Sequence, residues 1–238
     1  MNSAESSQET TSEQEQRPTV ILFLGDSITA DGRYIRMVEK ELRARGETIH
    51  LIARGVPSET VSGLSEKGHP GPRPCLHDRL DAVLEKTKPD RVVACYGMND
   101  GIYHPFAEER FAAYRAGIGK LRDRVAEAGI SIWLLTPPPF DAYSFTGTVL
   151  KQDATDFSYL TPYRGYDDVL RQYAEWLLQS DPASGTVDLR TPMMEAIRQA
   201  RRLDPHYSSG DGIHPDKAGH VVMAAALLNV PEITNGKY

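Results

Sequence analysis

The chain contains very little cysteine, only two residues in 238. Cys75 and Cys95 are too few for a disulfide framework, and they share no spacing typical of a metal site. Cys95 stands in an apolar, strand-like run, which favours a buried and unreactive thiol. A small disulfide-stapled or cysteine-metal protein is therefore excluded.

Long apolar runs and an excess of positive charge are also missing. No window of the sequence approaches the length of apolar residues that a bilayer span needs. The net charge of -6 and the pI near 5.7 argue against nucleic acid or an anionic membrane as a partner. The basic start and apolar stretch of a secretory leader are absent, so a cytoplasmic protein is the default expectation. A misassigned start codon or a removed leader would change this to a secreted or periplasmic protein.

The first seventeen residues have no aromatic and almost no aliphatic side chain. Such a segment cannot bury enough surface to offset the entropy of ordering it, so residues 1–17 are predicted to be a disordered tail. The remainder, with an ordinary content of hydrophobic and charged residues, fits one domain over residues 18–238. The sequence does not indicate the oligomeric state.

Short apolar runs alternate with helical patterns along this domain. The runs predict strands that are covered on both faces, at residues 19–24, 48–53, 91–96, 130–135 and 186–189. Helices are predicted at residues 33–45, 76–86, 107–128, 166–179, 193–202 and 216–228. Strict alternation implies parallel strands with right-handed crossovers, and hence a three-layer α/β/α sandwich around a sheet of about five strands.

Two long segments interrupt the alternation. Residues 57–75 are rich in proline and glycine, and residues 136–162 begin with three prolines and carry several aromatic side chains. Loops of this length in a compact domain are usually functional or disordered, and the second is too aromatic for a disordered linker. Both follow strands, so we expect them to rise over the carboxyl edge of the sheet as the walls of a substrate cleft. Surface packing without ligand contact is the alternative.

Ser27, in Gly25-Asp26-Ser27-Ile28, follows the first predicted strand and precedes a helical start. Open α/β sheets build their sites at the carboxyl ends of strands, which is where this hydroxyl would stand. A serine hydroxyl is a weak nucleophile and needs an adjacent base. Considered alone, Ser27 is more typical of a helix cap.

A candidate base and acid lie near the other end of the chain. His214 precedes Pro215, a good first-turn residue, and would therefore sit just outside a helix. Asp211, three residues earlier, can reach the ring nitrogen that does not face the serine and fix the tautomer. A turn aspartate and a surface histidine are the ordinary alternatives. Together, Ser27, His214 and Asp211 predict acyl-transfer chemistry.

Such chemistry also needs donors for an oxyanion. The amide of Asn99, the backbone N–H of Gly55 and the N–H of Ser27 are the candidates, and each follows a predicted strand. Gly97, just before Asn99, allows a tight turn after the third strand. A plain turn at Asn99 and a plain strand end at Gly55 are the alternatives.

Four short motifs carry a family resemblance: Gly25-Asp26-Ser27, Gly55, Gly97-x-Asn99-Asp100 and Asp211-x-x-His214. In this order they resemble the four sequence blocks of the SGNH hydrolases, the GDSL esterase/lipase superfamily. The resemblance covers residues 19–229 and implies a flavodoxin-like fold, a serine esterase without metal or organic cofactor, catalytic Ser27, Asp211 and His214, and an oxyanion hole of Ser27, Gly55 and Asn99. One departure is Ala53-Arg54-Gly55, because many members have an asparagine close before this glycine. The side chain of Arg54 is interpreted either as solvated at the end of the strand or as contacting a negatively charged or polar group of the substrate.

The resemblance further extends to esterases that deacetylate carbohydrates, and Tyr143, Tyr159 and Tyr163 suit sugar rings because they offer a flat apolar face and a polar tip. We therefore expect a small-molecule or oligosaccharide ester as substrate, with short acetyl groups. Acyl transfer to an alcohol would use the same residues.

Other classes of function receive less support from the sequence. A non-catalytic carbohydrate-binding scaffold is disfavoured by the intact serine, acid and histidine set. His206, His214 and His220 have no compact metal-ligand spacing. Residues 25–32 lack the dense glycines and the lysine of a phosphate-binding loop.

Overall fold

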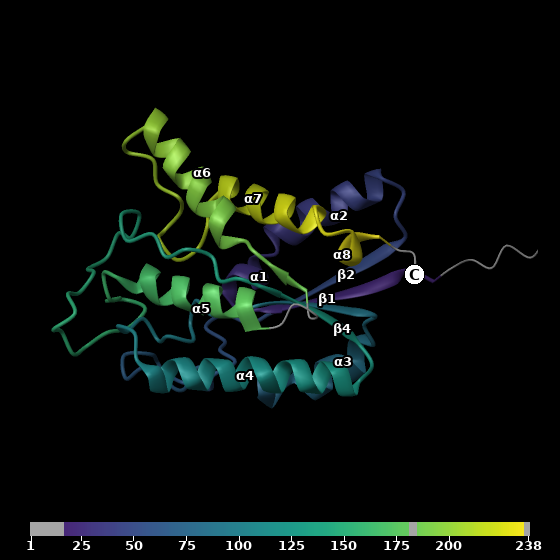
Figure 1. Ribbon diagram of the computed structural model, residues 1–238, viewed down its shortest axis with the longest axis horizontal. Helices are drawn as coiled ribbons and strands as arrows, with labels where there is room; N and C mark the ends of the chain where they lie inside the picture. The colour runs from purple at the N-terminus through teal and green to yellow at the C-terminus, as the bar shows by residue number, and fades with distance from the viewer. Residues whose placement is uncertain (1–16, 181–184, 236–238) are drawn as a thin grey trace, which may run out of the picture.

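A computed structural model describes residues 17–180 and 185–235. All five predicted strands form and pair in parallel in the order β2-β1-β3-β4-β5 (Figure 1). Their bounds are β1 Thr19–Gly25, β2 Ile49–Gly55, β3 Arg91–Cys95, β4 Ser131–Leu135 and β5 Thr186–Val187. Every residue of the central strand β3 is buried, as expected where helices cover both faces of a sheet. The predicted α/β class with a five-stranded parallel sheet is confirmed.

The helices form two layers around this sheet (Figure 1). Helices α3, α4 and α5 cover one face, while α2, α6, α7 and α8 lie over the other. Their bounds are α1 Ser27–Asp31, α2 Arg33–Ala44, α3 Leu80–Thr87, α4 Glu108–Glu127, α5 Tyr166–Ser180, α6 Arg190–Leu203, α7 Lys217–Leu228 and α8 Pro231–Thr234. Gly46 and Gly129 follow α2 and α4 in the left-handed conformation, which favours glycine after a helix.

The structure differs from the predicted elements in four places. The helix expected at residues 76–86 is divided into a 3₁₀ turn, Leu76–Asp78, and α3, with Arg79 between them in a non-helical conformation. A helical start at Ser27 was predicted and α1 begins there, but its end at Asp31 was not predicted, and neither was α8, because five and four residues are too short to show a helical period. Strand β5 is two residues long, half the predicted run.

Both long loops reach the carboxyl end of the sheet, as predicted, and they contact each other there. The backbone N–H of Tyr159 donates to Glu66 Oε1 at 3.3 Å, which joins loop 136–162 to loop 57–75. Phe140 and Phe157 are buried, so the aromatic side chains of the second loop include packing anchors. The loops lie at the left of Figure 1, at the end where α1 begins.

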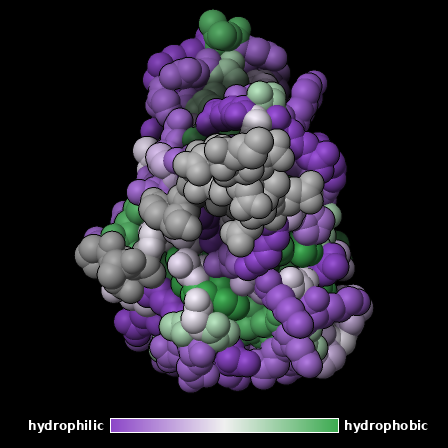
Figure 2. Space-filling model, turned by 90° about the vertical axis from the view of Figure 1, so that its right-hand side faces the viewer, coloured by the Kyte–Doolittle hydropathy of each residue, from purple (hydrophilic) through white to green (hydrophobic). Residues whose placement is uncertain are grey.

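The opposite end of the molecule holds the start of β1 and the end of the described chain. Polar side chains cover most of the surface visible there in Figure 2. Residues 1–16 of the predicted tail lie outside the described residues. Arg17, also assigned to that tail, forms a two-point ion pair with Asp90 at 2.5 and 3.0 Å.

Candidate active site

Ser27 is the first residue of α1, and Asp26 alone separates it from the end of β1. The helix is capped by Asp26, whose Oδ1 accepts the N–H of Ile28 at 2.9 Å. The capping role that a serine often fills is thus taken by its neighbour, and the Ser27 hydroxyl is free to point elsewhere. As the first residue of a helix, Ser27 also has a backbone N–H without a partner inside that helix.

The three predicted catalytic side chains form one hydrogen-bonded chain. Ser27 Oγ lies 2.7 Å from His214 Nε2, and His214 Nδ1 lies 2.8 Å from Asp211 Oδ2. Residues 187 positions apart are brought together here, because β1 ends at the same edge of the sheet from which α7 departs. The arrangement can pass a proton from the serine to the histidine while the aspartate holds the ring.

The segment before α7 fixes the aspartate and the histidine locally. Asp211 Oδ1 accepts the backbone N–H groups of Ile213 at 2.9 Å and His214 at 2.6 Å, so the carboxylate closes its own turn. Gly212 adopts φ +92°, a conformation that favours glycine. Pro215 lies just outside α7 rather than in its first turn, because Asp216 is the N-cap.

Electrostatics support the same proton chain. Burial alone would raise the pKa of Asp211, but hydrogen bonds from the His214 side chain and from backbone N–H groups outweigh it and lower the pKa to about 2. The hydrogen bond to Asp211 raises the pKa of His214 above its ordinary value, against the effect of burial. The aspartate therefore remains ionised and stabilises the protonated histidine.

Asn99 lies deep beside this chain, with 4% of its surface exposed. Its Oδ1 accepts hydrogen bonds from Tyr103 Oη at 2.9 Å and from Arg73 Nη1 at 3.1 Å. Its Nδ2 faces Asp26 Oδ2 and the carbonyl of Glu59, both at 3.3 Å. Both N–H groups of Nδ2 are engaged in these two contacts, which are long for N–H···O bonds, so an oxyanion would have to share or displace one of them.

Gly55 has a clear packing role. A Cβ at this position would lie 2.2 Å from Ala30 N and 2.6 Å from Asp26 O, so only glycine lets α1 approach β2 this closely. The N–H of Val56 donates to Gly25 O. Because N–H groups alternate in direction along a strand, the Gly55 N–H points away from β1. Its role as an oxyanion donor stays a prediction, and this direction gives it less support than Asn99 has.

The turn after β2 contains a feature that the sequence did not indicate. Ser58 adopts φ +66°, an uncommon conformation for a residue with a side chain. Its carbonyl accepts a hydrogen bond from Arg73 Nη1 at 3.2 Å, the same nitrogen that contacts Asn99. Serine is not a usual left-handed residue, so no pattern in the chain could have revealed this strain.

Two buried carboxylates support the site and were also missed by sequence reasoning. Burial raises the pKa of Asp26 to about 7 and that of Asp100 to about 6. Asp100 accepts the N–H groups of Val61 and Ser62 through Oδ1 and that of Gly97 through Oδ2. This aspartate thereby ties the turn after β2 to the turn after β3, which holds Asn99. The only available signal was that each aspartate adjoins a predicted site residue.

An apolar cavity of about 120 Å³ lies beside His214, between α6 and α7. Its walls include Met193, Ile197 and Ile213, together with His214 itself. Ser27 and Asn99 do not line it. Of the three predicted catalytic side chains, only His214 therefore contacts this cavity.

The other predicted contacts are distributed around the site. Tyr143 is exposed, with its ring 4.4 Å from the Arg201 guanidinium carbon, while Tyr159 and Tyr163 are half-buried. Arg54 is exposed and donates only to the carbonyl of its neighbour Ala53 among its described contacts, consistent with a solvated strand end.

The three histidines considered as metal ligands have different surroundings. His214 belongs to the proton chain, His206 is exposed, and His220 is buried on α7 with its ring stacked 6.1 Å from that of Tyr34. Within residues 17–180 and 185–235, no group of three or more His, Cys, Asp or Glu side chains is placed to hold a metal ion. No helix in the same two ranges is both long and apolar enough to cross a membrane.

A three-layer α/β fold with a serine–histidine–aspartate chain at the carboxyl edge of its sheet defines a serine hydrolase. Within that class, the chain belongs to the GDSL-like Lipase/Acylhydrolase family, whose model matches residues 23–222. It is accordingly a serine esterase of the GDSL type, which acts through an acyl-serine intermediate. No curated protein matches the chain by sequence.

Solved structures show the same fold at low sequence identity. A gut microbial diltiazem-metabolizing enzyme superposes with a TM-score of 0.68 and 22% identity, covering 90% of this chain and 47% of that one. The chain therefore spans about half the length of that enzyme. A variant of Axe2, an acetyl xylan esterase from Geobacillus stearothermophilus, superposes with a TM-score of 0.65 and 23% identity, covering 93% and 97%. A catalytic mutant of Axe2 superposes with a TM-score of 0.61 and 24% identity, covering 92% of this chain and 95% of that one.

Proposed function

We propose that Ser27 is the nucleophile of this esterase, His214 its general base and Asp211 the acid that orients the histidine. The observation that supports this most directly is the 2.7 Å contact between Ser27 Oγ and His214 Nε2, with Asp211 on the opposite ring nitrogen. Ser27 Oγ attacks the ester carbonyl carbon as its proton passes to His214 Nε2. Asp211 remains ionised throughout and stabilises the imidazolium.

The remaining steps use the same groups in turn. The tetrahedral oxyanion accepts hydrogen bonds from Asn99 Nδ2 and the Ser27 N–H, and the bond to the alcohol oxygen then breaks as His214 returns its proton to that oxygen. A water molecule, deprotonated by His214, attacks the acyl-serine, and the carboxylic acid leaves as Ser27 recovers its proton. Gly55 contributes by letting α1, and hence Ser27, lie against β2.

For the substrate we propose a short acyl ester, an acetyl group, on a carbohydrate. Three features favour it: the exposed Tyr143 and half-buried Tyr159 on the loop that borders the site, the position of the apolar cavity beyond His214, and the likeness to an acetyl xylan esterase. Tyrosine suits a sugar because the ring covers an apolar face of the sugar while the hydroxyl bonds to its oxygens. Ser27 does not line the apolar cavity, so the cavity gives no support to a long acyl chain on this serine.

A panel of esters tests both parts of this proposal. p-Nitrophenyl acetate, butyrate and octanoate are compared with acetylated xylo-oligosaccharides, using Ser27→Ala as the blank. We expect kcat/KM to fall steeply beyond acetate and acetate to be released from the oligosaccharides. Equal or greater activity on octanoate would contradict the acetyl assignment. Activity on small acetate esters without release from any oligosaccharide would contradict the carbohydrate part.

A further inference from the structure

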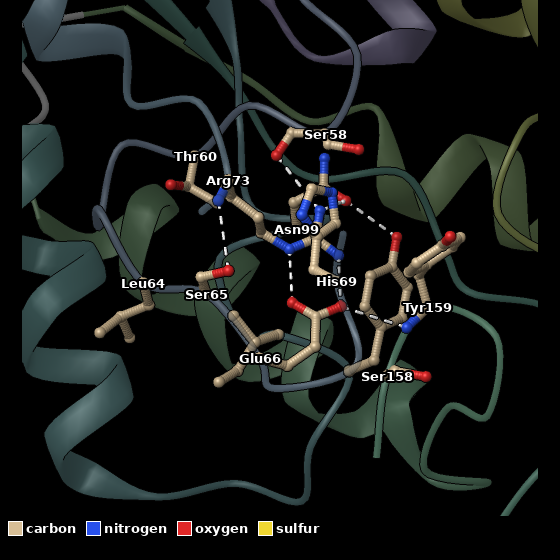
Figure 3. A network of polar contacts seen from close by, with 12 residues as sticks. Ser58, Thr60, Leu64, Ser65, Glu66, His69, Arg73, Asn99, Ser158 and Tyr159 are labelled. Atoms are coloured by element: carbon tan, nitrogen blue, oxygen red, sulfur yellow. Dashed lines mark hydrogen bonds and ion pairs between the residues drawn. The ribbon is translucent and has the colours of Figure 1, made fainter. Parts of the chain in front are cut away.

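Behind Asn99 lies a fully buried ion pair between Arg73 and Glu66 (Figure 3). Their side chains are 1% and 0% exposed. The pair is bidentate, since Arg73 Nε donates to Glu66 Oε2 and Nη2 donates to Oε1, each at 2.6 Å. The free energy needed to remove two charges from water offsets most of their mutual attraction, so such a pair contributes little net stability. Its presence in a proline-rich loop therefore calls for a role other than stability.

The third nitrogen of the guanidinium points toward the site. Arg73 Nη1 donates to Asn99 Oδ1 at 3.1 Å and to the carbonyl of Ser58 at 3.2 Å. Burial opposes the charge on Arg73, but Glu66 outweighs this effect and keeps the pKa of Arg73 above its ordinary value. A permanent positive charge is thus held on the carbonyl side of the Asn99 amide.

This contact has two consequences for Asn99. Because Oδ1 accepts from both Arg73 and Tyr103, the amide cannot flip without placing its NH₂ group against two donors. Nδ2 is therefore held toward the side of Asp26 and the Glu59 carbonyl, where Ser27 begins its helix. A cation on an amide oxygen also withdraws electron density from the nitrogen, which makes its N–H groups stronger donors.

The pair also connects Asn99 to the loop that borders the site. Glu66 Oε1 accepts the backbone N–H of Tyr159, and the Arg73 guanidinium carbon lies 5.4 Å from the Tyr103 ring centroid and 6.0 Å from that of Tyr159. His69 packs edge-on against the same Tyr159 ring, as Figure 3 shows. The guanidinium thus joins loop 57–75, loop 136–162 and the turn after β3.

We infer that Arg73, held by Glu66, is a positioning residue for ester hydrolysis, because it fixes the Asn99 amide with Nδ2 facing the reacting carbonyl and strengthens that donor. The inference rests on the proposed role of Asn99. It predicts that Arg73 acts on turnover through Asn99 alone, and that its effect disappears when Asn99 is absent.

The test removes both charges together, so that no unpaired charge is left buried. Arg73→Met combined with Glu66→Gln keeps an acceptor for the Tyr159 N–H. With p-nitrophenyl acetate we expect kcat to fall about 10- to 100-fold, with a change in KM below about threefold. In the Asn99→Ala background the same pair of substitutions should lower kcat by less than about threefold. An equal factor in both backgrounds would indicate a merely structural role and overturn the inference.

A second ion pair, which is partly buried, supplies the control. Arg190 Nη2 lies 2.5 Å from Asp167 Oδ2, with side chains 9% and 30% exposed, and Asp167 Oδ1 accepts the N–H of Phe140. Arg190→Met with Asp167→Asn should lower the unfolding temperature while kcat stays within about twofold of wild type. A fall in kcat equal to that of the Arg73 and Glu66 variant would contradict a specific role for Arg73.

Two further measurements keep the inference falsifiable. If the double variant does not fold, Arg73→Lys is the second test: it retains the charge, but its single nitrogen cannot reproduce the planar fork with which Nε and Nη2 hold Glu66 while Nη1 holds Asn99, and an unchanged kcat there would overturn the inference. The NMR signals of the Asn99 side-chain amide, assigned by their loss in Asn99→Ala, should be altered by the Arg73 substitutions whether or not esters are hydrolysed. Absence of esterase activity and of fluorophosphonate labelling in the wild type would overturn the proposed function, whereas unaltered Asn99 signals would overturn this inference.

Discussion

The two halves of the proposed active site are built in opposite ways. On the proton-transfer side, Asp211 and His214 have side chains 57% and 43% exposed, and they belong to one short turn. On the side of the proposed oxyanion donor, Asn99 is 4% exposed and is held by side chains and backbone from several segments distant in the sequence. One half is open and locally assembled, while the other is buried and assembled by the whole fold.

The difference follows from what each half must do. A histidine that takes a proton from serine and later from water needs access to solvent. An oxyanion donor needs a fixed direction in a dry environment, where a hydrogen bond is strongest and no reorganisation is needed during the reaction. The same contrast separates two aspartates: hydrogen bonds in the open turn lower the pKa of Asp211 to about 2, whereas burial raises that of Asp26 to about 7.

Removing the nucleophile tests the open half and should have the largest effect. We expect Ser27→Ala to lower kcat by about 10⁴-fold or more, because a catalytic triad acts as a unit. The fold should persist, since Asp26 rather than Ser27 caps α1. Hydrolysis of p-nitrophenyl acetate and labelling by a fluorophosphonate probe provide the measurements. A variant that keeps most of its turnover would refute the nucleophile assignment.

Removing the proposed donor tests the buried half. Asn99→Ala should lower kcat about 10²- to 10³-fold, with a smaller change in KM, because the oxyanion forms only after the substrate is bound. Steady-state kinetics on the same ester separates the two constants. An increase in KM with kcat unchanged would instead make Asn99 a substrate-binding residue.

The dependence of activity on pH sharpens the comparison between the halves. His214 must be neutral to accept a proton, so kcat/KM should rise with pH, by about tenfold per unit below the histidine pKa. The midpoint should lie above the ordinary histidine value of about 6.5, because Asp211 raises the pKa of His214. Asp211→Asn removes that cause and should move the midpoint to lower pH. A flat profile between pH 5 and pH 8 would argue against histidine as the base.

The contact between β2 and α1 at Gly55, which positions Ser27, should give the smallest effect. In Gly55→Ala the new methyl group would meet backbone atoms of Asp26 and Ala30, so α1 must move and carry Ser27 with it. We expect the free energy of unfolding to fall by about 1–3 kcal/mol, together with a loss of kcat. Gly119→Ala on α4, where a Cβ meets nothing within 4 Å, is the control and should be neutral or stabilising. Full activity and stability in Gly55→Ala would contradict the packing argument.

Sequence reasoning succeeded where the information is local. Residues 92–96, directly after Arg91, are all apolar and predict a buried strand, and β3 forms there. Asp211 and His214 are three residues apart, so a single turn is enough to join them. Prediction from the sequence failed at α8, because an element this short shows no hydrophobic periodicity. It also failed to show that a single residue, Arg79, divides the helix expected at residues 76–86.

The chain by itself determined the order of strands and helices, the parallel sheet that right-handed crossovers then require, and the serine, asparagine, aspartate and histidine that end up at its edge. Only the tertiary structure decided that Arg73 and Glu66, two charged residues of loop 57–75, are buried behind Asn99, and that Asp26 rather than Ser27 caps α1. The physical reason is that the cost and the use of a charge depend on what surrounds it, and those neighbours come from distant parts of the chain.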